Sequence, residues 1–136
     1  PNDASVFGRQ LYMDAEDTVL GEEESALLLA SGISIDGLPA LVRGYGGFCY
    51  PAHIDRASYS ITAVFGMLDA SMGFRCAEVS LAGEVPVLTT QYPALASMRV
   101  LRSSDAHTLE NMREAQDTLP LPQCTPPALI DYLAAL

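Results

Sequence analysis

The two histidines of the sequence each follow a short apolar run. His53 lies in the stretch FCYPAHIDR, and Asp105 and His107 end the stretch RVLRSSDAH. Imidazole nitrogens and carboxylate oxygens are donors that bind zinc, manganese or iron. An Asp-x-His pair that leaves a strand can direct both side chains at one point. These three residues are therefore candidate metal ligands. The alternative is that the histidines are hydrogen-bonded structural residues and that Asp105 caps a helix.

Arg56 is the candidate for binding phosphate, because it follows His53 by three residues and a guanidinium can hold two phosphate oxygens. The alternative is an ordinary surface ion pair with Asp55 or Asp69. The residue types alone leave both interpretations open.

Glu78 lies within an apolar run and is expected either near the same site or paired with Arg75 or Arg99. Ser103 is a candidate donor close to the proposed ligands. A serine at a strand end more commonly satisfies backbone groups.

Residues 33–136 must position these side chains, and their pattern predicts alternating strands and helices. The expected strands cover residues 48–50, 76–81 and 99–103. The expected helices begin at Asp36, at a cap on Asp55 or Ser58, near residue 93, and at Pro126 after a Thr125 cap. Such alternation indicates an α/β fold with a parallel sheet. Residues just beyond the carboxyl ends of parallel strands share one edge, which would bring the candidate residues together.

Residues 1–32 form a different, acidic region. Short apolar patches at residues 11–13 and 18–20 flank an acidic turn at residues 14–17, which predicts a β-hairpin. The run of glutamates at residues 22–24 is interpreted as a solvated acidic face rather than a metal site.

The composition excludes several classes of protein. The net charge of −10, with seven basic residues, argues against non-specific binding of nucleic acid or anionic membranes. No stretch approaches the roughly 18 apolar residues of a membrane span, and the N-terminus has no secretory pattern. The three widely spaced cysteines predict neither a disulfide framework nor a zinc knuckle. We therefore expect a cytoplasmic protein. Because the sequence begins with Pro1, we also expect a piece of a longer chain.

The stretches YPAHIDRASYSITAVFG, CAEVSL and RVLRSSDAH, in this order, resemble the second half of a PHP domain, the polymerase and histidinol phosphatase family. The stretch VFGRQLYMDAEDTVLGEEE resembles an insert found in a bacterial subgroup of stand-alone PHP proteins. The resemblance implies a distorted (β/α)7 barrel with two or three metal ions at the C-terminal face of its strands. His53 matches the third histidine motif of the family, and Asp105 and His107 match its closing Asp-x-His motif. The implied activity is hydrolysis of a phosphate ester, on a phosphorylated small molecule or a nucleotide.

The sequence departs from the family pattern in one respect, because it contains no His-x-His motif. The resemblance therefore implies the C-terminal portion of the barrel with an incomplete site for zinc, manganese or iron. We expect the isolated chain to be inactive, and to self-associate or to pair with the missing N-terminal half. A non-enzymatic PHP-like regulatory or ligand-binding module is the alternative. A third alternative is an amidohydrolase-like barrel, but that family would be expected to use a catalytic lysine, and this sequence contains no lysine.

Overall fold

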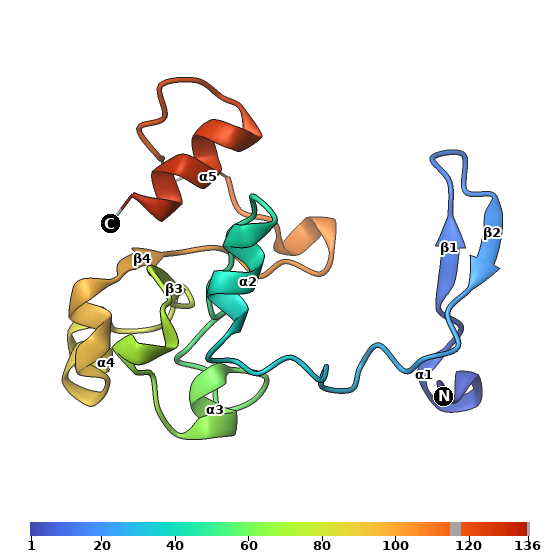
Figure 1. Cartoon of the computed structure of the whole chain (residues 1–136), viewed down its shortest axis with the longest axis horizontal. Coiled ribbons are helices and arrows are strands. Elements are labelled where there is room, and N and C mark those ends of the chain that lie inside the picture. Colours follow the sequence, from blue (N-terminus) through green and yellow to red (C-terminus); the bar gives the residue numbers. More distant parts are fainter. Residues whose placement is uncertain (115–117, 136) are drawn as a thin grey trace. The chain divides into compact units, whose positions relative to one another are not determined.

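The computed structural model describes residues 1–114 and 118–135 and divides into two compact units. The units are Pro1–Ile33 and Ser34–Leu136, so the boundary lies one residue beyond the expected one. Figure 1 shows both units. Together they give a mixed α/β chain, as the sequence predicts at the level of fold class.

The first unit contains a short helix, α1 (Ala4–Phe7), and the predicted hairpin. Strand β1 (Leu11–Met13) pairs antiparallel with β2 (Val19–Glu22), which confirms the hairpin. The turn closes on Asp14, whose carboxylate accepts the backbone N–H groups of Glu16 at 3.0 Å and Thr18 at 2.8 Å. Aspartate favours this kind of turn because its short side chain reaches the backbone just ahead of it.

The glutamates at the end of β2 bind residues of their own hairpin. The Glu22 carboxylate accepts from the Arg9 guanidinium at 2.8 Å, and the Glu23 carboxylate accepts from the Tyr12 hydroxyl. The hydrogen bond from Tyr12 is the main reason that the pKa of Glu23 lies below its usual value. These contacts belong to a solvent-facing acidic surface, where single ion pairs add little stability.

The second unit is built on the parallel pair β3 (Cys76–Glu78) and β4 (Arg99–Leu101). The expected strand at residues 48–50 is wrong, because these residues form no regular ladder. The chain just after them nevertheless follows β3. The Glu78 N–H donates to the Pro51 carbonyl and its carbonyl accepts from the Ile54 N–H, both at 2.9 Å. Two residues lie between these contacts, so the segment is too irregular to count as a strand.

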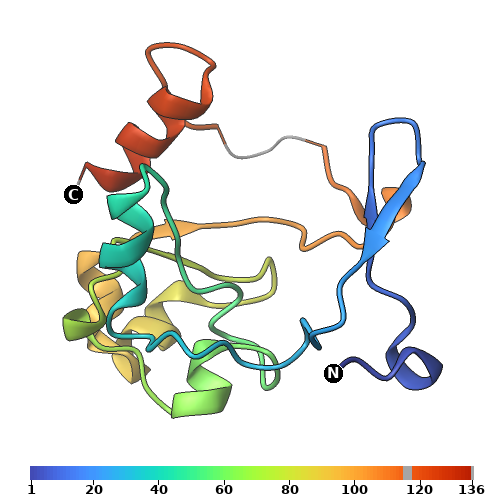
Figure 2. The same cartoon turned by 45° about the vertical axis from the view of Figure 1, so that its right-hand side comes forward.

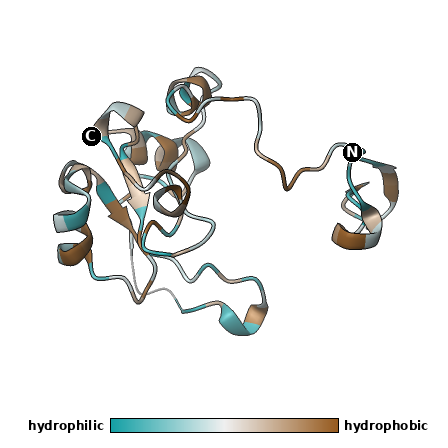
Figure 3. Cartoon of the chain, turned by 90° about the horizontal axis from the view of Figure 1, so that it is seen from below, coloured by the Kyte–Doolittle hydropathy of each residue, from teal (hydrophilic) through white to brown (hydrophobic). Residues whose placement is uncertain are grey.

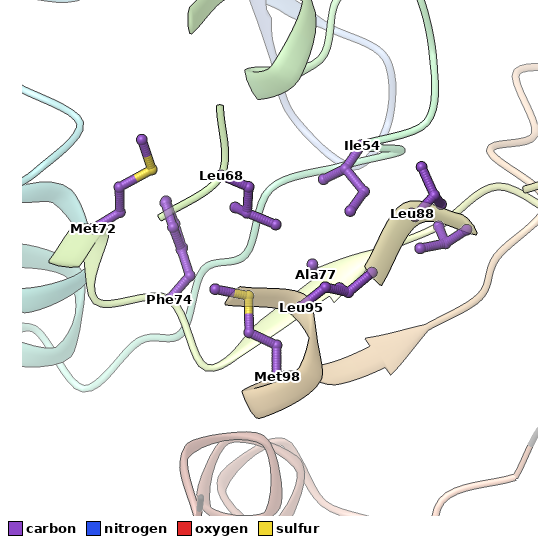
Figure 4. Packing of buried hydrophobic residues seen from close by; sticks show 9 residues of the cluster. Ile54, Leu68, Met72, Phe74, Ala77, Leu88, Leu95 and Met98 are labelled. Carbon is purple, nitrogen blue, oxygen red and sulfur yellow. The ribbon is translucent and has the colours of Figure 1, made fainter. Parts of the chain in front are cut away.

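One face of β3 and β4 packs into the hydrophobic core. Successive strand residues point to opposite faces, and Ala77, Val79 and Val100 lie on the core face. Figure 4 shows the side chains that meet them. The cluster consists of Ile54, Leu68, Met72, Phe74, Ala77, Val79, Leu88, Leu95 and Met98.

The opposite face carries Cys76 and Arg99 and lies against α5 (Pro126–Ala134). The Cys76 thiol donates to the Leu133 carbonyl at 3.6 Å, and the Arg99 guanidinium lies 3.9 Å from the centre of the Tyr132 ring. Figure 2 shows α5 on one side of β4 and α4 (Val85–Gln91) on the other. The predicted start of α5 is confirmed, since the Thr125 hydroxyl accepts from the Ala128 N–H.

The remaining helices partly confirm the sequence predictions. Helix α2 (Leu38–Gly44) begins after Gly37 rather than at an Asp36 cap, although Pro39 does lie in its first turn. Helix α3 (Ile61–Phe65) is capped by Ser60, not by Asp55 or Ser58. The cause is a turn just before it, where Tyr59 has a positive φ of 56°.

Three short 3-10 helices complete the unit, η1 (Ala70–Met72), η2 (Pro93–Ser97) and η3 (Leu109–Asn111). Residues 93–97 were expected to be helical, whereas α4 was not expected. Figure 3 shows apolar stretches alternating with polar ones in the helices around the strands. Within the described residues the sheets have two strands each, and no closed barrel is formed. No helix in this part of the chain is both long and apolar enough to cross a bilayer.

Candidate functional site

Asp105 lies between two of the residues singled out from the sequence. Its Oδ2 atom is 3.2 Å from Nη2 of Arg56, and its Oδ1 atom is 3.5 Å from Nε2 of His107. The Asp105 side chain is 26% exposed and the His107 side chain is 85% exposed. The loop after β4 thus meets the loop after residue 53. The ion pair of Arg56 is with Asp105, rather than with Asp55 or Asp69 as considered above.

His53 lies at the start of the loop that carries Arg56. The backbone N–H of Arg56 donates to the His53 carbonyl at 2.9 Å, which closes a turn. The Nδ1 atom of His53 is buried, and the described residues provide no hydrogen-bond partner for it. A buried ring nitrogen without a partner is costly, because it loses its contact with water and gains nothing in return.

Backbone strain marks the same two loops. His53 has a φ of 30° and Asp105 has a φ of 49°, both in the left-handed region that side chains other than glycine rarely adopt. Such residues cost on the order of 1–3 kcal/mol each and tend to cluster at functional sites, where the surrounding structure holds them. Two of the proposed ligands therefore lie in strained backbone.

Asp55 anchors the first loop to the end of β3. Its carboxylate accepts from the Ser80 backbone N–H at 2.7 Å and from the Ser80 hydroxyl at 2.5 Å. Partial burial by itself would raise the pKa of Asp55. The two hydrogen bonds from Ser80 and the charge of Arg56 outweigh burial, so the pKa lies below its usual value. The Asp55 carboxylate is consequently charged at neutral pH, and it ties the loop that carries Arg56 to Ser80.

Arg102 fixes the loop that follows β3. Its guanidinium donates to the carbonyls of Ser80 at 2.9 Å, Leu81 at 3.3 Å and Gly83 at 2.8 Å. Gly83 must be glycine here, because an added Cβ would lie 2.5 Å from Val79 Cγ1 and 2.8 Å from Asp55 Oδ2. The three loops at this edge of the sheet are therefore tied together by one carboxylate and one guanidinium.

Glu78 is 7% exposed, and its carboxylate accepts a hydrogen bond from the Ser103 hydroxyl. The alternative of an ion pair with Arg75 or Arg99 is not what the structure shows for this side chain, since the ion pairs of the described residues involve other carboxylates. Arg99 instead lies over Tyr132. The Ser103 hydroxyl therefore forms its hydrogen bond with Glu78 rather than with a backbone group.

The donor types of the candidate ligands suit a divalent cation. His53 has a buried nitrogen without a partner, and Asp105 and His107 present an oxygen and a nitrogen close to one another. In residues 1–114 and 118–135, however, no group of three or more His, Cys, Asp or Glu side chains is arranged to hold a metal ion. The donor types of these residues therefore suit a cation, but the described residues do not bring His53, Asp105 and His107 together around one point.

The sequence patterns missed the anchoring contacts. Asp55 was considered only as a helix cap or a partner of Arg56, and Ser80, Gly83 and Arg102 were not singled out. A serine and a glycine directly after a buried strand are a weak signal for a tight loop. Nothing in the sequence indicates which carboxylate that loop binds, because the contact spans 25 residues.

Comparisons with known proteins give no relative, since no protein-family model, no curated protein and no solved structure matches this chain.

Proposed function

We propose that the loops at residues 53–56 and 105–107 form part of the metal-binding and phosphate-binding site of a phosphoesterase. The chain would be the C-terminal portion of a PHP barrel, as its motifs suggest. The observation that carries the proposal is the position of Asp105, which joins Arg56 and His107 across two loops far apart in the sequence.

In this proposal His53, Asp105 and His107 are metal ligands, His53 through its buried Nδ1 nitrogen. When bound, divalent cations would polarise the phosphoryl oxygen, activate a water molecule and neutralise developing charge. The bound ions would be zinc, manganese or iron, which all accept histidine and aspartate as ligands.

Arg56 has the role of holding the phosphate group of the substrate. Its side chain is 49% exposed, and it lines a hollow of about 270 Å³ together with Thr62, Gln91 and Tyr92. The ion pair with Asp105 keeps the guanidinium beside the proposed ligands when substrate is absent. The Asp55–Ser80 contact holds the loop itself, so the position of Arg56 does not depend on the substrate.

The remaining ligands of the cluster would have to come from outside this sequence, because its two histidines are already assigned. The substrate would be a phosphorylated small molecule or a nucleotide. Among the described residues β4 pairs only with β3, and its other edge has no strand partner. We expect that edge to pair with the N-terminal half of the barrel or with a second copy, and the chain alone to have no efficient turnover.

The test measures cation binding and turnover on the same samples. Binding of Zn²⁺ and Mn²⁺ to the chain is measured by competition with a chromophoric chelator, and turnover with p-nitrophenyl phosphate. We expect binding that weakens at least about tenfold in His53→Ala, Asp105→Asn or His107→Ala, as loss of a ligand should cause. Glu110→Gln, an exposed change on the 3-10 helix η3, is the control. Turnover that survives combined His53→Ala and His107→Ala would refute the metal site.

The second candidate is a non-enzymatic module that binds a phosphorylated ligand. It is favoured by the ion pair between Arg56 and Asp105, because the guanidinium provides a positive partner for the carboxylate without a metal ion. This candidate predicts that inorganic phosphate or a nucleoside monophosphate binds in the presence of a chelator. Arg56→Ala should abolish that binding, and His107→Ala should leave it unchanged. Binding that requires added metal would favour the phosphoesterase.

A further inference from the structure

A cavity of about 610 Å³ lies beside the β3–β4 pair. Glu78 and Leu101 border it from the face that points away from the core, and Val100 and Val85, which pack against the core, also line it. Its walls are mostly apolar, and they come from both strands, from the start of α4 and from α5. The apolar residues that line it include Val85, Leu101, Leu129 and Leu133. A volume in the range of about 300–1,000 Å³ is typical of sites for small molecules.

Glu78 introduces a carboxylate into this apolar wall. The residue is 7% exposed, and it lies on the same face of β3 as Cys76, which binds α5 through the Leu133 carbonyl. The Ser103 hydroxyl donates to Oε1 of Glu78, and no donor to Oε2 is seen among residues 1–114 and 118–135. A buried carboxylate is stable only where charge or hydrogen bonds replace the water that it loses.

The basic residue that lines this cavity, Arg102, forms its hydrogen bonds with backbone carbonyls rather than with Glu78. Arg102 lines the cavity, but its guanidinium donates to the carbonyls of Ser80, Leu81 and Gly83. The ion pairs of the described residues involve other carboxylates, so the Glu78 side chain has no cationic partner in this part of the chain. The cavity therefore combines apolar walls with a carboxylate that forms no ion pair among the described residues, although the Arg102 cation lines the same cavity.

Tyr50 supplies a second polar group to the same cavity. Partial burial raises the pKa of its hydroxyl, and the negative charge of Glu78 raises that pKa further. The hydroxyl is consequently protonated at neutral pH and able to donate. The face of its ring is also a surface on which a cation binds favourably.

We propose that this cavity is a binding site for a small organic cation, a primary ammonium group carried on an apolar body, with Glu78 as the partner of the charge. The ammonium group would donate to Oε2 of Glu78, and the apolar body would contact Leu129, Leu133 and Val85. The site uses none of His53, Arg56, Asp105 or His107, so this inference does not rest on the proposed function.

The test uses benzylammonium as probe and benzyl alcohol as its neutral counterpart. Each is titrated into the full chain, and the amide signals of β3, β4 and α5 are followed by two-dimensional NMR. We expect saturable shifts in these elements with benzylammonium, and binding of the alcohol weaker by about tenfold to a hundredfold. That is the factor expected for one hydrogen bond to a charged group.

Two variants and a control separate this site from general attraction to an acidic protein. Glu78→Gln keeps the shape of the side chain and should weaken benzylammonium by the same factor, whereas the exposed change Glu110→Gln should have no effect. Leu129→Trp fills the cavity and should remove binding of both probes. The proposal is overturned by equal binding of the two probes, by unchanged binding in Glu78→Gln, or by the absence of saturable binding. If Glu78→Gln does not fold, retained binding in Leu129→Trp overturns it instead.

Discussion

The two faces of the β3–β4 pair differ in what covers them. On one face Ala77 and Val79 are fully buried against a closely packed cluster of aliphatic and sulfur-containing side chains. On the other face Glu78 and Leu101 border a cavity of about 610 Å³ under α5. The strand period of two residues makes this division possible, because adjacent residues serve opposite surfaces. The first face belongs to the buried apolar cluster of the second unit, whereas the second face borders open volume.

The largest effect should come from removing a large side chain on the packed face. Leu95 is 2% exposed and belongs to the core cluster. Leu95→Ala should lower the free energy of unfolding by about 2–5 kcal/mol, because it removes apolar contacts and leaves a void. The matched control is Leu109→Ala, since Leu109 is 82% exposed. Urea denaturation followed by circular dichroism measures both. Equal effects of the two changes would contradict the assignment of the core.

The next largest effect on the free energy of unfolding should come from the contact between Asp55 and Ser80, which ties two loops together at the end of β3. Asp55→Asn removes the charge that accepts two hydrogen bonds from Ser80, and should cost about 1.5–3 kcal/mol at neutral pH.

That effect should depend on pH in a defined direction. Because the pKa of Asp55 is lowered in the folded state, its stabilisation is complete above the unfolded pKa of about 3.9 and disappears as pH falls through the folded pKa. The difference between the original chain and Asp55→Asn should therefore shrink below about pH 4. Asp36→Asn is the control, since Asp36 is exposed and no hydrogen bond to its side chain is seen among the described residues. A difference that grows on acidification would exclude this role of Asp55.

Enlarging a side chain should distinguish the two faces of the β3–β4 pair more sharply than shortening one. Ala77 is fully buried on the packed face, so Ala77→Val should cost about 1–3 kcal/mol through overpacking. Leu129→Phe extends a side chain into the cavity and should change the free energy of unfolding much less. Thermal unfolding of both variants measures this contrast. A reversed order would mean that the cavity is not open space.

The smallest effect should come from the cap of α5. Thr125→Ala removes the hydroxyl that accepts from the Ala128 N–H and should cost about 1 kcal/mol. Thr108→Ala is the matched control, because the Thr108 side chain makes no capping hydrogen bond. Amide hydrogen exchange should show the loss of protection confined to α5 and the cavity face. Loss of protection in the core cluster would show that the two faces are not independent.

Local chemistry predicted several elements correctly. The hairpin followed from two apolar patches around an acidic turn, and the cap of α5 followed from Thr125 before Pro126. Strands at Cys76–Glu78 and Arg99–Leu101 followed from their apolar runs. The strand expected at residues 48–50 failed because apolar content alone does not show whether a neighbour will form a regular ladder.

The candidate site was only partly accessible from the sequence. His53, Arg56, Asp105 and His107 were singled out by type and spacing, and the structure brings Arg56, Asp105 and His107 into contact. The sequence alone did not indicate that Arg56 would form its ion pair with Asp105 rather than with its sequence neighbour Asp55. The reason is that Asp55 is occupied by Ser80, a choice fixed by how two loops pack.

The sequence by itself determined the hairpin, the two parallel strands, the start of α5, the acidic charge and the residue types on which the proposed cation and phosphate site is based. Each of these depends on side-chain type and on neighbours a few positions away. The tertiary structure alone decided that Glu78 would be buried with no ion pair among the described residues, that a cavity would form beside it, and that Asp105 would join two loops. These features depend on contacts between residues more than 20 positions apart, such as those of Ser103 with Glu78 and of Arg56 with Asp105, and no local pattern in the sequence specifies such partners.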